Sequence, residues 1–355
     1  MDRPTIDIYE GRAAEWAKLR PPRHRTATAA FSERCLPGRV RADLGCGPGS
    51  YFADLGRPLS GLDGAEAMLH LARRAAPDAM LVRGDLEHLP FARAGLGGAW
   101  ARASYLHVAR NGLPAALAQL HAALALGAPV ELTVRVGDGE GPLPDDDFAG
   151  RFFALWQPDA LASVVAGAGF RLDGLDDTGD GWLVVRATRD RTLPDFVGPG
   201  MRILVCGLNP SVVAADAGYG YAGATNRFWA AASASGLISV PRRPVAALHT
   251  DRVGMTDLVK RATPRSSGVL RHEYADGATR VRRLVEWLQP RLVLFVGLEG
   301  WRGAIDRAAR PGLQAEPFGG AAAYLMPSTS GVNGHATLAD LVGHMEAALG
   351  YADGR

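Results

Sequence analysis

The chain has 355 residues, of which 47% are hydrophobic, enough for packed cores in what its length suggests are two domains. No apolar run approaches about 18 residues and the first residues lack a signal-peptide pattern, so we expect no membrane partner. Three cysteines, Cys35, Cys46 and Cys206, are not spaced as a metal site or an iron–sulfur cluster, so we expect no metal and a reducing cytoplasm.

Charge is unevenly distributed along the chain, although the net charge is only +2. Up to Asp190, Lys and Arg fall short of Asp and Glu by 3, and from Arg191 onward they exceed them by 5. A basic second half suits a partner with a phosphate backbone, such as DNA. Many basic domains bind no nucleic acid, so charge alone leaves this partner open.

The first half alternates apolar strands with helices after a short amphipathic helix over 9–19. Strands are predicted over 40–44, 59–63, 80–85, 98–103 and 130–136, and helices over 113–126 and 158–168. Residues 138–147 should form a polar loop, and 171–175 and 182–187 an antiparallel pair that closes the sheet. The alternation predicts a mostly parallel sheet with helices on both faces.

A glycine-rich turn follows the first of these strands. It contains Gly45, Gly47 and Gly49, with Asp43 two residues before the first glycine. Glycines at such a turn let a nucleotide approach the backbone closely. A dinucleotide fingerprint would have its third glycine one position later, where Ser50 stands, so the spacing argues against a dehydrogenase.

Acids stand at the ends of the next two strands. Asp63 follows Asp43 by twenty residues, and a carboxylate there can accept both ribose hydroxyls of an adenosine. Together with the turn, Asp63 and Asp85 resemble the class I S-adenosylmethionine-dependent methyltransferases, in which the second acid lies beside the adenine amine. The resemblance implies a Rossmann-like domain over 1–188 with S-adenosylmethionine as cofactor. Its implied cofactor-binding residues are Asp43, Gly45, Gly47, Gly49, Asp63 and Asp85.

The methyl acceptor stays unassigned. DNA and RNA amino-methyltransferases usually carry Asn/Asp-Pro-Pro-aromatic after the fourth strand, and Ser104-Tyr105-Leu106-His107 stands there instead. A Pro-Cys nucleophile of the cytosine-carbon type is also absent. His107 is either a general base or a structural residue that lines the cofactor pocket.

A second strand–turn unit organises the other half of the chain. Residues 202–206 predict a buried parallel strand, and the turn Leu208-Asn209-Pro210-Ser211 follows it. Open α/β sheets bind ligands at the carboxyl ends of their strands, so Asn209 should lie at the mouth of a cleft. Its amide can hold a water with its oxygen and donate from its nitrogen. This suits a reaction with a good leaving group, in which the water needs position more than activation.

The remaining elements predict a second three-layer α/β/α sheet. Strands are expected over 291–296 and 322–326, a strand–helix segment over 253–260, and helices over 277–288, 301–309 and 338–348. A loop rich in Gly and Ala should span 214–225. Asn226-Arg227-Phe228-Trp229 should then open a helix, with Phe228 and Trp229 in the core.

Three blocks of this half resemble the mismatch-specific uracil/thymine DNA glycosylases. They are Gly207-Leu208-Asn209-Pro210, Asn226-Arg227-Phe228-Trp229 and Met326-Pro327-Ser328-Thr329-Ser330-Gly331-Val332, in order and at compatible spacing. The resemblance implies a uracil-DNA glycosylase fold over 193–355 that acts on uracil-containing or mismatched duplex DNA without a cofactor. The expected fold class is therefore α/β, with a Rossmann-like methyltransferase domain followed by a glycosylase domain.

The resemblance also implies residue roles in base excision, which requires the nucleotide outside the duplex. Asn209 would position the attacking water. Backbone N–H groups near Leu208 and Tyr221, with Ser328 beside them, would bind the departing base. The ring of Tyr221 would stack on that base. Gly331-Val332 would enter the vacated stack as an apolar wedge.

The sequence departs from the glycosylase pattern at several positions. Ser211 replaces the usual Gly after Asn-Pro, and Tyr221 replaces the usual Phe. Ser328 and Gly334 stand where the bacterial enzymes carry Asn and Arg, which leaves the recognition of the opposite guanine open. Two functions therefore remain: a bifunctional glycosylase and methyltransferase, or a methyltransferase whose second domain only binds nucleic acid. Retention of Asn209 favours the first.

Overall fold

The computed structural model describes residues 2–354 and divides them into two units. The first comprises the residues up to Ala166 together with Phe170–Asp190, and the second comprises Gly167–Gly169 together with the residues from Arg191 onward. Within residues 2–354, no helix combines the length and apolar character that crossing a membrane requires.

The first unit is built on a nine-stranded sheet with the central order β3-β2-β1-β4-β5, all parallel. β7 continues β5 in parallel, β9 pairs antiparallel with β5 and β8, and β6 pairs antiparallel with β7. The strands are β1 (Val40–Leu44), β2 (Leu59–Asp63), β3 (Met80–Arg83), β4 (Leu96–Arg102), β5 (Pro129–Val136), β6 (Glu140–Pro142), β7 (Phe152–Trp156), β8 (Phe170–Asp177) and β9 (Trp182–Arg189).

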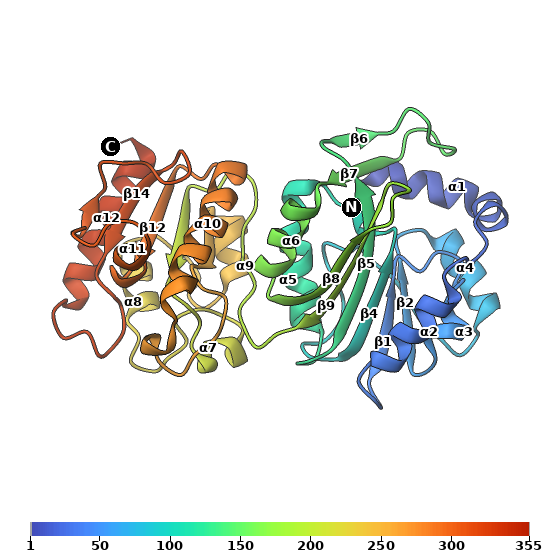
Figure 1. The fold of residues 1–355 in the computed structure, drawn as a ribbon, viewed down its shortest axis with the longest axis horizontal. Coiled ribbons are helices and arrows are strands. Elements are labelled where there is room, and N and C mark those ends of the chain that lie inside the picture. The colour runs from blue at the N-terminus through green and yellow to red at the C-terminus, as the bar shows by residue number, and fades with distance from the viewer. Residues whose placement is uncertain (1, 355) are drawn as a thin grey trace. The chain divides into compact units, whose positions relative to one another are not determined.

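Helices cover both faces of this sheet (Figure 1). On one face, Phe31, Phe52 and Leu69 bring three helices together over Trp100 of β4. Figure 1 shows α5 and α6 on the opposite face, and α1 packs on α4 through Ala13. The helices are α1 (Arg3–Leu19), α2 (Arg25–Arg34), α3 (Phe52–Leu55), α4 (Glu66–Ala75), α5 (Leu113–Ala123) and α6 (Pro158–Gly167), with 3-10 turns at Tyr105–His107 and Arg110–Gly112.

The first unit differs from the sequence predictions at several elements, among them α3, α4 and β7, which were not predicted. α1 begins at Arg3, earlier than predicted, because the carboxylate of Asp2 accepts from Thr5 N (2.9 Å) and Thr5 Oγ1 (2.7 Å) and caps the helix. α2 was not predicted, and only Thr28 and Phe31 of it are buried. The predicted loop over 138–147 contains β6, so part of it belongs to the sheet.

The second unit contains a five-stranded sheet in the order β11-β10-β12-β14-β13. Its first four strands are parallel and β13 is antiparallel to β14. Every residue of β10 and β12 is buried, as expected for central strands covered on both faces. The strands are β10 (Ile203–Gly207), β11 (Val253–Asp257), β12 (Leu292–Val296), β13 (Gly312–Leu313) and β14 (Ala322–Met326).

Successive residues of β10 face opposite helical layers, which makes this unit a three-layer α/β/α structure. Ile203 and Val205 pack with residues of α8 and α12, whereas Leu204 and Cys206 pack with residues of α10 and α11. The predicted α/β class with two three-layer domains is confirmed. The helices are α7 (Val212–Ala217), α8 (Phe228–Ala234), α9 (Pro244–Ala246), α10 (Arg271–Leu288), α11 (Glu299–Ala304) and α12 (Leu338–Asp353), with shorter turns at Ala247–Asp251 and Ser266–Gly268.

Several predictions for the second unit need correction, and the helices predicted over 277–288 and 301–309 are observed as Arg271–Leu288 and Glu299–Ala304. The stretch predicted as a loop over 214–225 begins inside α7, which Ser211 caps by accepting from Ala214 N at 3.1 Å. The predicted strand–helix segment over 253–260 is a strand followed by turns, and the next long helix starts only at Arg271. Phe228 and Trp229 lie in the core, 0% and 5% exposed, as predicted.

Candidate functional site

The glycine-rich turn after β1 has a backbone that needs its glycines. Gly45, Gly47 and Gly49 have φ angles of 75°, 52° and 77°, in the left-handed region that side chains disfavour. A Cβ on Gly45 would come within 2.4 Å of Ser104 Cβ, and one on Gly49 within 2.9 Å of the Phe52 ring. The turn is therefore tightly fitted, and its backbone is exposed to whatever occupies the space in front of it.

Asp63, at the end of β2, holds the turn in place. Its Oδ2 accepts from Gly47 N at 2.8 Å, and its Oδ1 accepts from Ala65 N at 2.9 Å. Burial raises the pKa of Asp63 despite these hydrogen bonds. Asp85 follows β3, and its carboxylate accepts from Glu87 N at 2.9 Å. Asp63 thus bridges two parts of the predicted cofactor site, while Asp85 is anchored in its own loop.

A cavity of about 980 Å³ lies in front of the turn, within the first unit. This is at the upper end of the volumes of small-molecule sites. Asp43, Gly45, Gly47 and Asp63 line it, whereas Gly49 and Asp85 do not, although the neighbours of Asp85 on either side do. Four of the six predicted cofactor-binding residues therefore share one cavity.

Asp43 is the most unusual acid in this cavity. Its side chain is only 2% exposed, and its Oδ2 has no hydrogen-bond partner within residues 2–354. Burial, and next the charge of Asp63, raise the pKa of Asp43 to about 8. This buried oxygen lines a cavity, so a donor on a bound molecule can supply the missing hydrogen bond.

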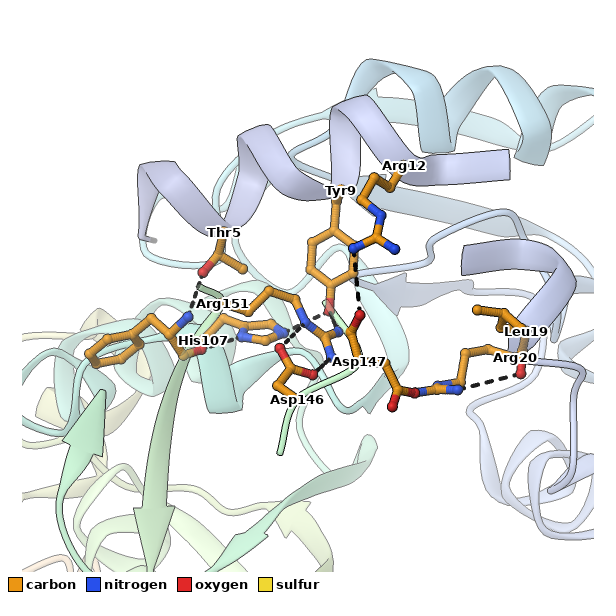
Figure 2. A network of polar contacts seen from close by, with 10 residues as sticks. Thr5, Tyr9, Arg12, Leu19, Arg20, His107, Asp146, Asp147 and Arg151 are labelled. Atoms are coloured by element: carbon orange, nitrogen blue, oxygen red, sulfur yellow. Dashed lines mark hydrogen bonds and ion pairs between the residues drawn. The ribbon is translucent and has the colours of Figure 1, made fainter. Parts of the chain in front are cut away.

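A polar network joins α1 to the segment before β7 (Figure 2). Tyr9 Oη lies 2.9 Å from His107 Nε2 and accepts from Arg151 Nη1 at 2.7 Å. Arg151 also forms a buried ion pair with Asp146, and Phe152 N donates to Thr5 Oγ1 at 2.8 Å. Neither Tyr9 nor Arg151 was predicted as a site residue, since they come together only in the folded chain.

His107 uses both ring nitrogens in this network. Nδ1 lies 2.6 Å from the carbonyl oxygen of Phe152, so it must carry the proton, and Nε2 accepts from Tyr9 Oη. Burial lowers the pKa of His107 to about 4. Of the two roles left open for His107, the geometry favours the structural residue that lines the cavity.

In the second unit, the side chain of Asn209 has a fixed orientation. Its Nδ2 donates to Thr263 Oγ1 at 2.7 Å, to Arg261 O at 3.0 Å and to Pro210 O at 3.2 Å. Thr263 Oγ1 donates onward to Arg265 O at 2.7 Å, so it must act as an acceptor toward Asn209. These partners assign the nitrogen, and Oδ1 remains as the free acceptor of the amide.

Tyr221 lies beside the end of β10. Its ring stacks on Phe228 with centroids 3.9 Å apart and planes at 15°, and its φ is 59°. Its hydroxyl has no hydrogen-bond partner among the described residues. The carboxylate of Asp257, at the end of β11, lies against Gly207, where burial and then the charge of Asp195 raise its pKa to about 6 over the opposing effect of Lys260.

The third block forms a loop that Arg227 holds. The guanidinium of Arg227 donates to the carbonyl oxygens of Ser330 (3.2 Å), Asn333 (2.8 Å) and Ala336, and its backbone N donates to Thr329 O at 3.0 Å. From the sequence, Arg227 was placed at a helix start and in the second glycosylase-like block, without a role of its own. Its contacts are with backbone atoms more than 100 residues away, which a local motif does not indicate.

The predicted wedge residues lie on this loop. Gly331 packs against Thr225, because a Cβ on Gly331 would come within 2.4 Å of Thr225 Oγ1. Val332 is 94% exposed, which is unusual for an apolar side chain. Ser328 accepts from Ser330 N at 3.3 Å through its hydroxyl. Arg227 therefore holds the backbone of this loop, and the loop exposes the Val332 side chain to solvent.

A buried ion network supports the second site. Asp195 accepts from Thr256 Oγ1 at 2.6 Å, from Lys260 Nζ at 2.9 Å and from Arg280 Nη1 at 2.6 Å. Arg280 also donates to the backbone oxygen of Asp257 at 2.6 Å. The network fixes the end of β11 beside Gly207 at the end of β10. No cluster of three or more metal-ligating side chains occurs in the part of the chain that the structure describes.

Comparisons with known proteins address each unit. Residues 42–127 match the methyltransferase domain family, and residues 194–347 match the uracil DNA glycosylase superfamily. Similar solved structures include a Haloferax volcanii methyltransferase in a complex with the Trm112 methyltransferase activator (18% identity, 52% of this chain and 97% of that chain, TM-score 0.42). Others are DhpI in a complex with SAH (20%, 54% and 99%, 0.42) and the 1,6-didemethyltoxoflavin-N1-methyltransferase of Burkholderia thailandensis (20%, 54% and 92%, 0.41). The chain thus combines a methyltransferase domain with a domain of the uracil DNA glycosylase superfamily.

Proposed function

We propose that the chain is a bifunctional enzyme. Its second domain removes uracil from DNA by hydrolysis of the N-glycosidic bond, with thymine as a further substrate, and prefers G·U mismatches. Its first domain transfers a methyl group from S-adenosylmethionine to an acceptor that the motifs do not name. The glycosylase acts without a cofactor. The observation that carries the proposed glycosylase activity is the fixed orientation of the Asn209 amide.

Asn209 is suited to hold a water molecule. Three acceptors take the hydrogens of Nδ2, so Oδ1 accepts a hydrogen from a water and orients its lone pair toward the sugar. As the glycosidic bond lengthens, C1′ gains positive charge and uracil departs as an anion. The water oxygen then bonds to C1′ and the released proton neutralises the base. Asn209 contributes position, which a reaction with this leaving group needs most.

The residues around Asn209 support extrusion and capture of the base. Leu208 and Tyr221 follow the end of β10, and the Tyr221 ring offers a stacking surface worth about 1–3 kcal/mol per base. Val332 can fill the space that the extruded nucleotide leaves. A G·U wobble pair costs less to open than a matched pair, so extrusion favours it.

The test is single-turnover release of uracil from duplex and single-stranded DNA by the full chain. Asn209→Ala should lower the cleavage rate by about 100-fold or more while DNA binding survives, since one positioned polar group is lost. Gln314→Ala, which removes an amide bonded only near β13, should leave cleavage unchanged. If the wild-type chain binds uracil-containing DNA but releases no uracil, the second domain is a nucleic-acid-binding module.

The proposed cofactor of the first domain rests on the shared cavity of Asp43, Gly45, Gly47 and Asp63. The carboxylate of Asp63 can accept the ribose hydroxyls while it holds the turn. Calorimetric titration of S-adenosylmethionine should show binding that Asp63→Ala weakens by about 1 kcal/mol or more. Tight binding of NAD instead of S-adenosylmethionine would contradict the proposal.

A further inference from the structure

Arg102 ends β4 and lines the same cavity as the glycine-rich turn. Trp100 of β4 is paired with Asp43 of β1, so Arg102 is level with Gly45, two residues further along each chain. The end of β4 therefore lies beside the glycine-rich turn, and Arg102 shares its cavity. None of the motifs in the sequence assigns it a role.

The partners of Arg102 are neutral. Its Nη2 contacts His24 Nε2, and it interacts with the hydroxyl of Tyr51. Burial, and then the charge of Arg102 itself, lower the pKa of His24, so the imidazole accepts as a neutral ring. Within residues 2–354, no carboxylate lies within ion-pair distance of Arg102, and Glu131 and Asp180 act on it only at longer range.

Five other arginines line this cavity, and three of them pair with acids. Arg20 pairs with Asp147, Arg151 with Asp146 and Arg186 with Asp176. Arg135 lies over the ring of Trp182 at 5.0 Å. Arg23 forms no ion pair among the described residues, but it is exposed to solvent. Within residues 2–354, Arg102 is thus the partly buried arginine of this cavity that has neither an acid nor an aromatic face against it.

A partly buried guanidinium without a counter-ion is costly. Burial lowers the pKa of Arg102, yet an arginine side chain stays protonated at any ordinary pH. A charge withdrawn from water is normally compensated by an opposite charge at hydrogen-bond distance. The planar fork of arginine matches carboxylate and phosphate groups with two parallel hydrogen bonds.

We propose that Arg102 binds the carboxylate or phosphate group of a small molecule held in this cavity. The proposal rests on the proposed methyltransferase function for the identity of that molecule. One source is the amino-acid carboxylate of S-adenosylmethionine, and the other is an anionic group on the methyl acceptor. Both place an anion with two acceptor oxygens against the guanidinium.

Calorimetry with the full chain separates the two sources. The ligands are S-adenosylhomocysteine and its decarboxylated analogue S-(5′-adenosyl)-3-thiopropylamine, which differ only in the carboxylate. If Arg102 binds the cofactor carboxylate, Arg102→Met weakens the binding of S-adenosylhomocysteine by tenfold or more and leaves the binding of the analogue unchanged. If it binds the acceptor, both affinities stay the same. Benzoate or phenyl phosphate, added to the chain saturated with S-adenosylhomocysteine and followed by ligand-observed NMR, then binds the wild type and not the variant.

Two further variants make the result interpretable. Arg171→Met removes an exposed arginine that pairs with Asp173 outside the cavity, and it should change neither the affinity for S-adenosylhomocysteine nor the binding of the small anions. Arg102→Lys keeps the charge, so it should lose less affinity than Arg102→Met for the ligand whose binding changes. It also takes the place of Arg102→Met if that variant unfolds. If the wild type binds no S-adenosylhomocysteine, the proposed cofactor is wrong. Binding of benzoate or phenyl phosphate is then measured without S-adenosylhomocysteine. If substitution of Arg102 changes neither arm, the guanidinium only tethers His24 and Tyr51, and the proposal is overturned.

Discussion

Asp43 and Asp195 are each 2% exposed, yet the two units treat these buried acids in opposite ways. Asp195 accepts three hydrogen bonds, two of them from Lys260 and Arg280. Burial alone would raise its pKa, but the charges of Arg280 and Lys260 hold the pKa of Asp195 below its usual range. Asp43 has an oxygen without a partner, and its pKa rises to about 8.

The difference separates a carboxyl that stabilises the fold from one that is available to a ligand. An acid with a lowered pKa adds stability above its unfolded pKa and loses it as the pH falls. An acid with a raised pKa does the reverse, because the fold favours its neutral form and loses stability as the pH rises toward the folded pKa. Asp195 should therefore stabilise the second unit at neutral pH, whereas Asp43 should destabilise the first unit until a donor binds it.

The largest expected effect is that of Asp195→Asn on stability. Loss of the charge leaves Lys260 and Arg280 buried without their acid, which should cost about 3–5 kcal/mol in the free energy of unfolding of the second unit. Urea unfolding at pH 7 measures this cost. Asp216→Asn breaks the exposed pair with Arg191 and serves as the control, with a change of less than about 1 kcal/mol. A cost below about 1 kcal/mol at Asp195 would show that the network is not a stabilising element.

The same substitution at Asp43 should have the opposite sign. At pH 8 the ligand-free Asp43→Asn chain should be more stable than the wild type by about 1–3 kcal/mol, since a buried charge is removed. At pH 4 both side chains are neutral and the difference should vanish. Unfolding of the first unit at both pH values measures this. A destabilised variant at pH 8 would mean that Asp43 has a donor in the folded chain.

A smaller effect is expected from Arg227, which holds the loop of Val332. Arg227→Met removes the donors to three carbonyl oxygens, so the loop is less ordered and pays more entropy on binding DNA. We expect about tenfold weaker binding of uracil-containing duplex, with the single-turnover rate at saturation within about threefold. Arg227→Lys should recover part of the affinity. Arg307→Met removes an exposed arginine that follows α11, and it controls for lost positive charge. If Arg307→Met weakens DNA binding as much as Arg227→Met does, the effect comes from the lost charge and not from the order of the loop.

Much of the fold could be predicted where the residues of a strand themselves mark its two ends. The predictions for β1 and β2 agree with the structure to the residue, because an apolar run ends at a glycine or an acid. The start of α10 could not be predicted, since its first turns are polar and depend on Glu273, which accepts from Leu270 N at 2.7 Å. α2 escaped prediction for a similar reason, as it buries few apolar residues.

For the sites, residues at strand ends could be placed and their long-range partners could not. Asn209 and Asp63 follow directly from the strands that precede them. Two of the three acceptors that orient Asn209 lie more than 50 residues away, and Tyr9 meets His107 across 98 positions. Such contacts depend on how elements pack, so the sequence indicates which residues carry chemistry but not which residues hold them in position.

The smallest expected effect is that of Tyr221→Phe, and it bears on the same contrast between satisfied and unsatisfied polar groups. The Tyr221 hydroxyl is buried without a partner in residues 2–354, so its removal should leave stability unchanged or raise it by about 1 kcal/mol. The ring that stacks on Phe228 stays, and uracil release should remain within about twofold of the wild type. Tyr221→Ala removes the stacking surface and should weaken capture of the base by about 1–3 kcal/mol. If Tyr221→Phe instead loses tenfold or more in uracil release with its stability intact, the hydroxyl contacts the extruded base, and Tyr221, like Asp43, is a buried polar group kept unpartnered for a ligand.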